Sequence, residues 1–291
     1  MTTAAEIVKA LGGHSIGRGS YMTHCPVHKD DTPSLSIKQG AGGIVLFYCH
    51  AGCEYNDIVN ALRARGVLNG RGKISKKVVV MRENDSERTE KALEIWRESR
   101  PAIGTLVETY LRARGISLPL PDSIRFHPKL RHSSGETCPG MVALVTSSID
   151  NVPVAVHRTF LARDGRSKAK VSPSKMMLGP CRGGVVRLGD LVPKLLIAEG
   201  IETALAGMAI FKRAAWAALS TSGLKRLDLP TSVKEVHILA DNDEPGKQAA
   251  AEAQARWAAG GVIVRIQIPF TGKDFNDRLG AHHERLRQGA E

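Results

Sequence analysis

The chain has 291 residues, 42% of them hydrophobic, and a formal net charge of +12. This length allows two or three domains with cores of their own, and five cysteines without an export signal favour metal ligation over a disulfide framework. No run of eighteen apolar residues occurs, and the N-terminus has no basic segment before an apolar one, so we expect a cytoplasmic protein without a membrane partner.

The positive charge is unevenly distributed along the chain. Residues 191–291 carry 13 Lys and Arg against 12 Asp and Glu, whereas residues 1–190 carry 28 against 17. A basic excess of this kind indicates contact with phosphate backbones. A basic surface that serves only solubility is the alternative that charge by itself leaves open.

The first 68 residues contain two pairs of metal-binding side chains. Cys25 and His28 form the first pair and Cys49 and Cys53 the second, with twenty residues between the pairs. Each spacing is that of a turn that directs two ligands to one ion, and four nitrogen or sulfur ligands form a closed tetrahedral Zn²⁺ site. A core this small would depend on the metal for its stability, so we predict a zinc ribbon over residues 1–68.

His24 and His50 are rival ligands, because each lies next to a predicted one. Neighbouring side chains in an extended segment point to opposite sides, so we leave both histidines out of the predicted set. Free buried cysteines with a surface histidine are the alternative for the whole group, and the paired spacing disfavours it. Helices predicted over residues 4–11 and 55–65 would complete the domain.

Three details of this segment resemble the N-terminal zinc-binding domain of bacterial and phage primases. They are Cys25-Pro26-x-His28, the Thr-Pro-Ser run at 32–34 before an alternating strand, and Tyr48 directly before Cys49. The resemblance implies that this domain binds single-stranded DNA and helps to select a start site. The second pair is Cys-x-x-x-Cys where replicative primases have Cys-x-x-Cys, which is closer to relatives from mobile elements and leaves the metal prediction unchanged.

The next part of the chain is predicted to be mixed. Residues 69–88 are polar and punctuated by glycine, which predicts a linker. We expect residues 89–190 to form a mixed α+β subdomain. The elements predicted there are helices over 90–98 and 105–114, an irregular proline-rich stretch over 118–131, and strands over 141–146 and 152–159.

A basic segment lies near the end of this part. Residues 158–187 hold eight lysines and arginines and a single acid, Asp164. A basic hairpin here could hold template phosphates or an incoming triphosphate, and a solvated basic hairpin is the alternative. The segment resembles the basic segment that precedes the catalytic domain of bacterial primases. The resemblance implies that the residues in contact with nucleic acid or nucleotide are Arg158, Lys168, Lys170 and Lys175.

Two apolar runs in the last part end in carboxylates that are followed by a glycine. Residues 194–198 lead into Glu199, and residues 237–240 lead into Asp241-Asn-Asp243. Helical patterns alternate with these runs, which implies a parallel sheet whose ligands bind beyond the carboxyl ends of the strands. Three carboxylates at one edge repel each other without a cation, and an all-oxygen set suits Mg²⁺ or Mn²⁺. A solvated acidic turn that caps a helix is the alternative.

Glu199-Gly200 and Asp241-x-Asp243-x-x-Gly246 resemble the Toprim signature shared by bacterial-type primases, topoisomerases and some nucleases. The resemblance implies a Rossmann-like parallel sheet of about four strands over residues 191–291, with Glu199, Asp241 and Asp243 as the catalytic metal site. Lys273 and Asp274 lie in a segment similar to one that contributes to metal or nucleotide binding in phage and plasmid Toprim primases. Asp274 is therefore a further predicted metal ligand and Lys273 a predicted nucleotide contact, while capping of a following helix is the alternative for Asp274.

Together these parts predict an α/β protein with a zinc ribbon, a mixed α+β subdomain and a Toprim domain. The resemblance implies a mobile-element type of DNA primase, which makes short RNA primers on single-stranded DNA from nucleoside triphosphates. Zn²⁺ would be its structural metal and Mg²⁺ or Mn²⁺ its catalytic metal, with Glu199 also the candidate general base for the 3′-hydroxyl. A replicative helicase is a further partner that the resemblance suggests. The alternatives are a Toprim nuclease and an inactive single-stranded DNA-binding accessory protein.

Overall fold

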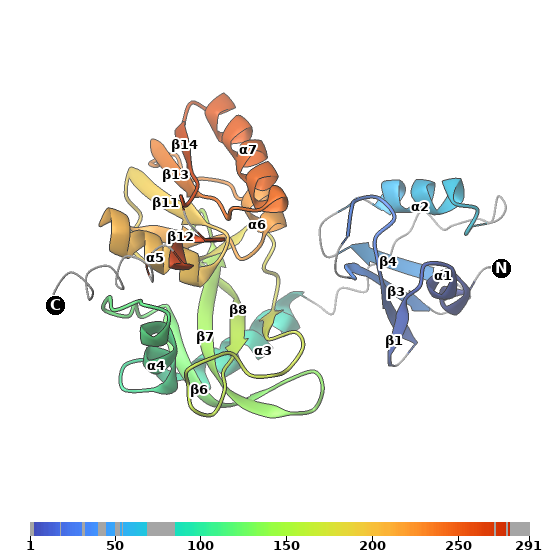
Figure 1. Cartoon of the computed structure of the whole chain (residues 1–291), viewed down its shortest axis with the longest axis horizontal. Coiled ribbons are helices and arrows are strands. Elements are labelled where there is room, and N and C mark those ends of the chain that lie inside the picture. The colour runs from blue at the N-terminus through green and yellow to red at the C-terminus, as the bar shows by residue number, and fades with distance from the viewer. Residues whose placement is uncertain are drawn as a thin grey trace. The chain divides into compact units, whose positions relative to one another are not determined.

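The computed structural model of the chain divides into two compact units, Met1–Arg82 and Glu83–Glu291 (Figure 1). The residues that it describes are 3–17, 19–30, 33–39, 45–49, 53, 55–68, 85–270, 272–277 and 279. No helix among these residues is both long and apolar enough to cross a membrane. Each unit is described by itself.

The first unit is a four-stranded antiparallel sheet with a helix before it and a helix after it. Its elements are α1 (Ala4–Ala10), β1 (His14–Gly17), β2 (Ser20–Thr23), β3 (Leu35–Gln39), β4 (Val45–Cys49) and α2 (Tyr55–Ala64). Both predicted helices are therefore confirmed. Thr3 caps α1 through a capping box with Glu6, which satisfies backbone donors at the start of the helix. Ile7, Ile37 and Leu62 are fully buried between the helices and the sheet.

The second unit is built on one ten-stranded sheet within the described residues. Its first half contains α3 (Asp85–Glu98), β5 (Arg100–Pro101), α4 (Leu106–Ala113), β6 (Ile124–Arg131), β7 (Thr137–Ser147), β8 (Pro153–Phe160), β9 (Lys175–Leu178) and β10 (Gly184–Arg187). Its second half contains β11 (Lys194–Ala198), α5 (Ile201–Phe211), β12 (Ala215–Ala217), α6 (Thr221–Arg226), β13 (Glu235–Leu239), α7 (Glu244–Ala259) and β14 (Ile263–Gln267).

The predicted parallel sheet of about four strands is confirmed. Strands β14, β13, β11 and β12 are neighbours in that order and pair in parallel. Helix α5 packs on one face of these strands, and α6 and α7 pack on the other (Figure 1). Burial on both faces explains why the inner strand β11 contains a continuous apolar run, Leu195-Leu196-Ile197, rather than an alternating one.

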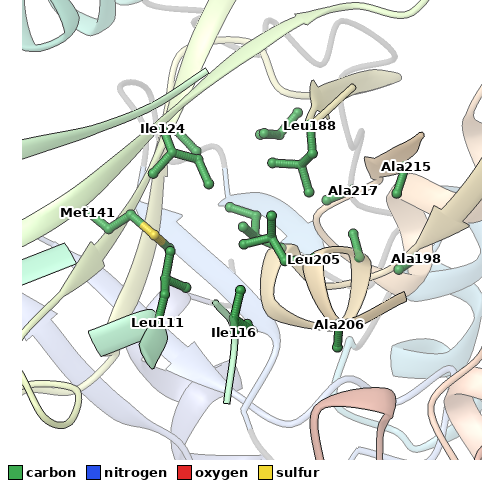
Figure 2. Close-up of a cluster of buried hydrophobic side chains, with 14 of the residues drawn as sticks. Leu111, Ile116, Ile124, Met141, Leu188, Ala198, Leu205, Ala206, Ala215 and Ala217 are labelled. Atoms are coloured by element: carbon green, nitrogen blue, oxygen red, sulfur yellow. The ribbon is translucent and has the colours of Figure 1, made fainter. Parts of the chain in front are cut away.

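Strand β10 joins this parallel part to the antiparallel part, because it pairs with β12 on one side and with β7 on the other. A common core reinforces the connection. Figure 2 shows Leu111 and Met141 from the first half in the same cluster as Leu205 and Ala217 from the second. The predicted parts 89–190 and 191–291 are thus two halves of one compact unit.

The prediction that residues 118–131 are irregular is wrong for the second half of that stretch. Residues 124–131 form β6, in which Ile124 and Phe126 are buried. Pro128 lies where the register with β7 shifts between His127 and Leu130, and a proline is tolerated at such a bulge because no ladder donor is needed there.

The predicted linker 69–88 also ends earlier than expected. Helix α3 begins at Asp85, five residues before the predicted start at Glu90, so the last four residues of that stretch are helical. Residues 69–84 lie outside the described part of the chain.

Candidate functional site

The carboxylates predicted to converge come from the loops that follow parallel strands. Glu199 follows β11 and Asp241 follows β13, and these two strands are direct neighbours. Asp274 belongs to the loop after β14, which docks on the same edge where the backbone N–H of Asn242 donates to the carbonyl of Lys273 at 2.7 Å. Glu199, Asp241 and Asp274 all line one cavity of about 200 Å³.

Asp243 is exposed and is not among the residues that line this cavity, so its role as a metal ligand stays a prediction, and its side chain has a structural task. Its Oδ1 accepts the backbone N–H of Gly246 at 2.8 Å and so caps α7. Gly246 is required by close approach, since a Cβ there would lie 2.9 Å from both the Asp241 carbonyl and Asp243 Oδ1. The cap that the sequence allowed as an alternative is therefore present, and the same turn places Asp241 at the cavity.

Asp274 likewise caps the short helical turn that follows it. Its Oδ1 accepts the backbone N–H groups of Asn276 and Asp277 at 2.8 and 2.9 Å. Because the residue also lines the cavity, capping and a position beside Glu199 and Asp241 are both present, and its role as a metal ligand stays a prediction.

Burial and mutual repulsion disfavour the charged forms of two of these carboxylates. Burial, with the charges of Asp241 and Asp243, raises the pKa of Glu199 to about 7. Burial, with Asp274 and Asp243, raises the pKa of Asp241 to about 6. Asp241 Oδ1 is buried and has no hydrogen-bond partner among the described residues. An all-oxygen set with an unsatisfied buried oxygen fits a hard divalent cation, which would neutralise the cluster.

These shifts predict a pH dependence of stability. The pKa of Glu199 is raised above its unfolded value, so between about pH 4 and pH 7 the native state binds more protons than the unfolded state and stability falls as pH rises. In buffer without Mg²⁺ or Mn²⁺, we expect the free energy of unfolding of the wild type to fall between pH 5.5 and pH 8. In Glu199→Gln this decrease should be smaller by about 2 kcal/mol. Thermal unfolding at the two pH values measures it, with the exposed Glu94→Gln as control. An unchanged pH dependence in Glu199→Gln would contradict the assignment.

The lining of the cavity also contains cations. Lys168, Lys175 and Arg114 line it, together with His157. Burial, with the nearby charge of Lys175, lowers the pKa of His157 to about 4, so this imidazole is neutral at pH 7. Burial and the same lysine also lower the pKa of Lys168. The cavity lining thus combines carboxylates that fit a metal with cations that fit phosphate oxygens.

The structure brings only part of the predicted basic set to the cavity. Lys168 and Lys175 line it, whereas Lys170 and Lys273 are exposed and do not. Arg158 is only 8% exposed and stacks over Phe160 on the face of β8 that packs against α3, opposite the face of His157. Alternation of side chains along the strand separates them. Contacts of Lys170, Lys273 and Arg158 with nucleic acid stay predictions.

Three further residues at the site lie outside the predicted set. Arg114 lies at the C-terminal cap of α4, more than forty residues before the basic segment. A positive charge is common at the end of a helix, so the sequence gives no indication that this arginine belongs to a binding site. His157 adjoins the predicted Arg158 but faces the other way. Glu202 is buried, and it accepts a hydrogen bond from the Tyr110 hydroxyl at 2.8 Å and another from Lys175 Nζ at 2.9 Å.

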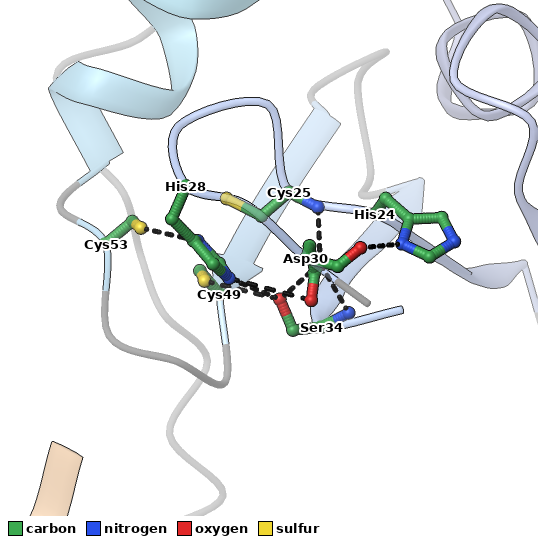
Figure 3. Close-up of polar contacts among 7 residues, drawn as sticks. All are labelled: His24, Cys25, His28, Asp30, Ser34, Cys49 and Cys53. Carbon is green, nitrogen blue, oxygen red and sulfur yellow. Dashed lines mark hydrogen bonds and ion pairs between the residues drawn. The ribbon is translucent and has the colours of Figure 1, made fainter. Parts of the chain in front are cut away.

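The first unit holds a separate cluster. One ligand atom from each of Cys25, His28, Cys49 and Cys53 lies within 4.8 Å of the others, as predicted (Figure 3). Burial, with the neighbouring Cys49 and Cys25, raises the pKa of Cys53 to about 12. Packed thiols that resist ionisation are stabilised as thiolates by a bound cation, so this donor set forms a metal-binding group.

Asp30 organises the cluster and was not predicted. Its Oδ2 accepts the backbone N–H of Cys25 at 2.7 Å and the hydroxyl of Ser34 at 2.7 Å, and its Oδ1 lies 3.6 Å from His28 Nε2. His28 Nδ1 lies 3.2 Å from Cys53 Sγ, so the ring places Nδ1 toward the thiols and Nε2 toward the carboxylate. Such a carboxylate orients a metal-bound histidine.

The rival histidines have different outcomes. His24 lies outside the cluster, with Nδ1 2.8 Å from the carbonyl oxygen of Asp30 (Figure 3). His50 lies outside the described residues.

Comparison with known proteins identifies the second half of the larger unit. Residues 194–284 match the family model of the Toprim domain, so this part of the chain is a Toprim domain. Residues 86–188 match a family model described as a domain of unknown function (DUF7146). No curated protein sequence matches the chain.

Solved structures of primases are similar to the chain at low identity. The zinc-binding and RNA polymerase domains of the Aquifex aeolicus primase match with 16% identity and a TM-score of 0.45, over 99% of this chain and 85% of that one. The primase fragment of the bacteriophage T7 primase-helicase matches with 16% identity and a TM-score of 0.41, over 66% and 73%. The RNA polymerase domain of the Mycobacterium tuberculosis primase matches with 17% identity and a TM-score of 0.34, over 81% and 82%.

Proposed function

We propose that the protein is a DNA primase that synthesises short RNA primers on single-stranded DNA by metal-dependent nucleotidyl transfer. The observation that carries the proposal is one cavity lined by both carboxylates and cations. Glu199, Asp241 and Asp274 offer oxygens for a divalent cation, and Lys168 and Lys175 add positive charge to the same lining. Carboxylates bind a divalent metal and lysines bind phosphate oxygens, so this lining suits a complex of a metal ion with a triphosphate.

The residues of the cavity have separate tasks in this reaction. Glu199 accepts the proton of the primer 3′-hydroxyl, a role for which its carboxylate is available at the cavity. The freed 3′-oxygen attacks the α-phosphate in line, and pyrophosphate leaves with its charge opposed by Lys168 and Lys175. Asp241, with Asp243 and Asp274, would hold Mg²⁺ or Mn²⁺, which when bound stabilises the negative charge on the reacting phosphate.

The Cys-His-Cys-Cys group of the first unit would hold Zn²⁺, since four N and S ligands form a closed structural site for that ion. Zinc would then hold Cys25, His28 and Cys53 against Cys49 at the end of β4, and we assign this unit to binding of the single-stranded template. Nucleoside triphosphates are the second partner that the proposal requires. A replicative helicase is the third, and it rests on the resemblance to primases.

Primer synthesis tests the proposal directly. The protein is incubated with single-stranded DNA, labelled ribonucleotides and Mg²⁺ or Mn²⁺, beside an Asp241→Ala/Asp243→Ala variant. Short labelled products that are absent with the variant are expected. Degraded template without product would replace the primase with a nuclease, and tight DNA binding with neither activity would reduce the protein to an accessory factor.

A further inference from the structure

Glu202 is the most deeply buried carboxylate at the cavity, and it is not arranged as a metal ligand. Its side chain is 5% exposed. Oε1 accepts the Tyr110 hydroxyl at 2.8 Å, and Oε2 accepts Lys175 Nζ at 2.9 Å. Each oxygen is therefore engaged by a donor, in contrast to Asp241 Oδ1, which has no hydrogen-bond partner in the described part of the chain.

The electrostatics agree with a permanently charged Glu202. Burial acts against its ionisation, but the charge and hydrogen bond of Lys175 outweigh burial and hold the pKa of Glu202 well below its usual range. A buried carboxylate held in its charged form by a cation is a stable anchor for that cation.

Lys175 is placed to use this anchor. Its side chain is 35% exposed and lines the cavity, so the ammonium reaches both Glu202 and the open space. An ammonium has three N–H donors, and Glu202 takes one of them. A lysine side chain otherwise loses much rotamer freedom when it binds a ligand, and a fixed partner removes part of that loss before binding.

The three residues also come from separate parts of the larger unit. Tyr110 lies on α4 and Lys175 on β9, whereas Glu202 lies in the first turn of α5, in the Toprim domain. The hydrogen bonds thus fix Lys175 at the cavity to the helix that follows Glu199.

We propose that Glu202 is a positioning residue that holds the Lys175 ammonium at the cavity, where Lys175 binds the triphosphate of the incoming nucleotide. This inference rests on the proposed function, and it adds a part that the metal site does not supply. Tyr110 fixes the carboxylate from the other side. Glu202 touches neither the metal nor the nucleotide, and it acts only through Lys175.

A double-mutant cycle tests the inference. The dissociation constant of GTP is measured with Mg²⁺ for the wild type, Glu202→Gln, Lys175→Ala and the double variant. We expect Glu202→Gln to weaken GTP binding about tenfold, as for one charge-assisted contact, and to have no further effect in the Lys175→Ala background. The matched control is Glu252→Gln on α7, whose carboxylate also accepts a hydrogen bond from a lysine, Lys225, at 2.9 Å but is not part of the cavity lining.

Kinetics separate positioning from metal ligation. In primer synthesis, Glu202→Gln is expected to raise the KM for nucleotide about tenfold with kcat nearly unchanged, since a contact present in ground and transition states is lost. The Mg²⁺ concentration for half-maximal rate should stay that of the wild type, whereas Asp241→Asn should shift it. Thermal unfolding confirms that the variants are folded. If Glu202→Gln does not fold, Tyr110→Phe, which removes the other hydrogen bond to Glu202, is measured instead. Weaker GTP binding that disappears in the Lys175→Ala background supports the inference, and unchanged binding overturns it.

The outcomes for the inference and for the proposed function differ. Wild-type protein that makes primers, with equal GTP affinity in Glu202→Gln, would overturn the positioning role and leave the primase standing. A weakening by Glu202→Gln that persists in the Lys175→Ala background would also overturn it, because Glu202 would then act by another route. Wild-type protein that neither binds GTP nor makes primers would remove the primase proposal and the inference together.

Discussion

Replacing Asp241 by Asn is expected to slow primer synthesis by about 10³-fold or more, because metal stabilisation of the transition state supplies several kcal/mol and each 1.36 kcal/mol is a factor of ten. The substitution keeps the shape of the side chain and removes the charge of a carboxylate whose buried Oδ1 has no hydrogen-bond partner among the described residues. Single-stranded DNA binding should be unchanged, since we assign it to the first unit. Initial rates of primer synthesis and a DNA titration measure the two properties.

The same variant should unfold at a higher temperature than the wild type in buffer without divalent metal. Neutralising Asp241 relieves its repulsion with Asp274 and Asp243, so stability is gained where activity is lost. Asp228→Asn is the matched control, because this aspartate is exposed and pairs with Arg256 on the surface. Primer synthesis by Asp241→Asn at the wild-type rate would refute the placement of the metal site.

Replacing Cys49 by Ser is expected to abolish stoichiometric zinc binding and to unfold the first unit. Structural Zn²⁺ in small domains contributes roughly 10–16 kcal/mol of apparent binding free energy, which exceeds the stability that a short four-stranded sheet can have by itself. Cys49 ends β4 and is 3% exposed, so a substitute ligand cannot reach the ion without moving the strand. Zinc content and limited proteolysis measure the effect.

The second unit should remain folded in this variant, with its own thermal transition, because its core is formed within Glu83–Glu291. Cys138→Ser is the control, since Cys138 lies outside the cluster and should leave zinc content unchanged. Full zinc content in Cys49→Ser would show that another residue completes the ligand set.

The position of Glu202 bears on how the two halves of the larger unit depend on each other. Its partners Tyr110 and Lys175 lie in the part that matches a domain of unknown function, and Glu202 lies in the Toprim domain. The two halves also share a hydrophobic core and one sheet. Together with these, the hydrogen bonds of Glu202 hold the cavity residues of one half in place relative to those of the other. We therefore expect neither half to form the nucleotide site by itself.

The sequence by itself determined the features that follow from a short spacing or from the end of an apolar strand. Cys25 and His28 lie three positions apart, and one turn suffices to bring them together. Glu199 and Asp241 each end an apolar run, and parallel strands place their carboxyl ends at one edge, so convergence followed from the pattern. The match to the family model of the Toprim domain confirms the predicted domain.

Only the tertiary structure decided which basic residues share the cavity with the carboxylates. Arg158 and His157 are neighbours in sequence, but side chains alternate along β8. His157 therefore lines the cavity, and Arg158 lies on the opposite face of the strand. Arg114 reaches the cavity because α4, which is distant in sequence from the Toprim domain, packs beside α5, where Tyr110 of α4 donates a hydrogen bond to Glu202. The periodicity of a strand or helix determines which side chains share a face. Which other element packs against that face is determined by long-range packing, and no local sequence pattern contains this information.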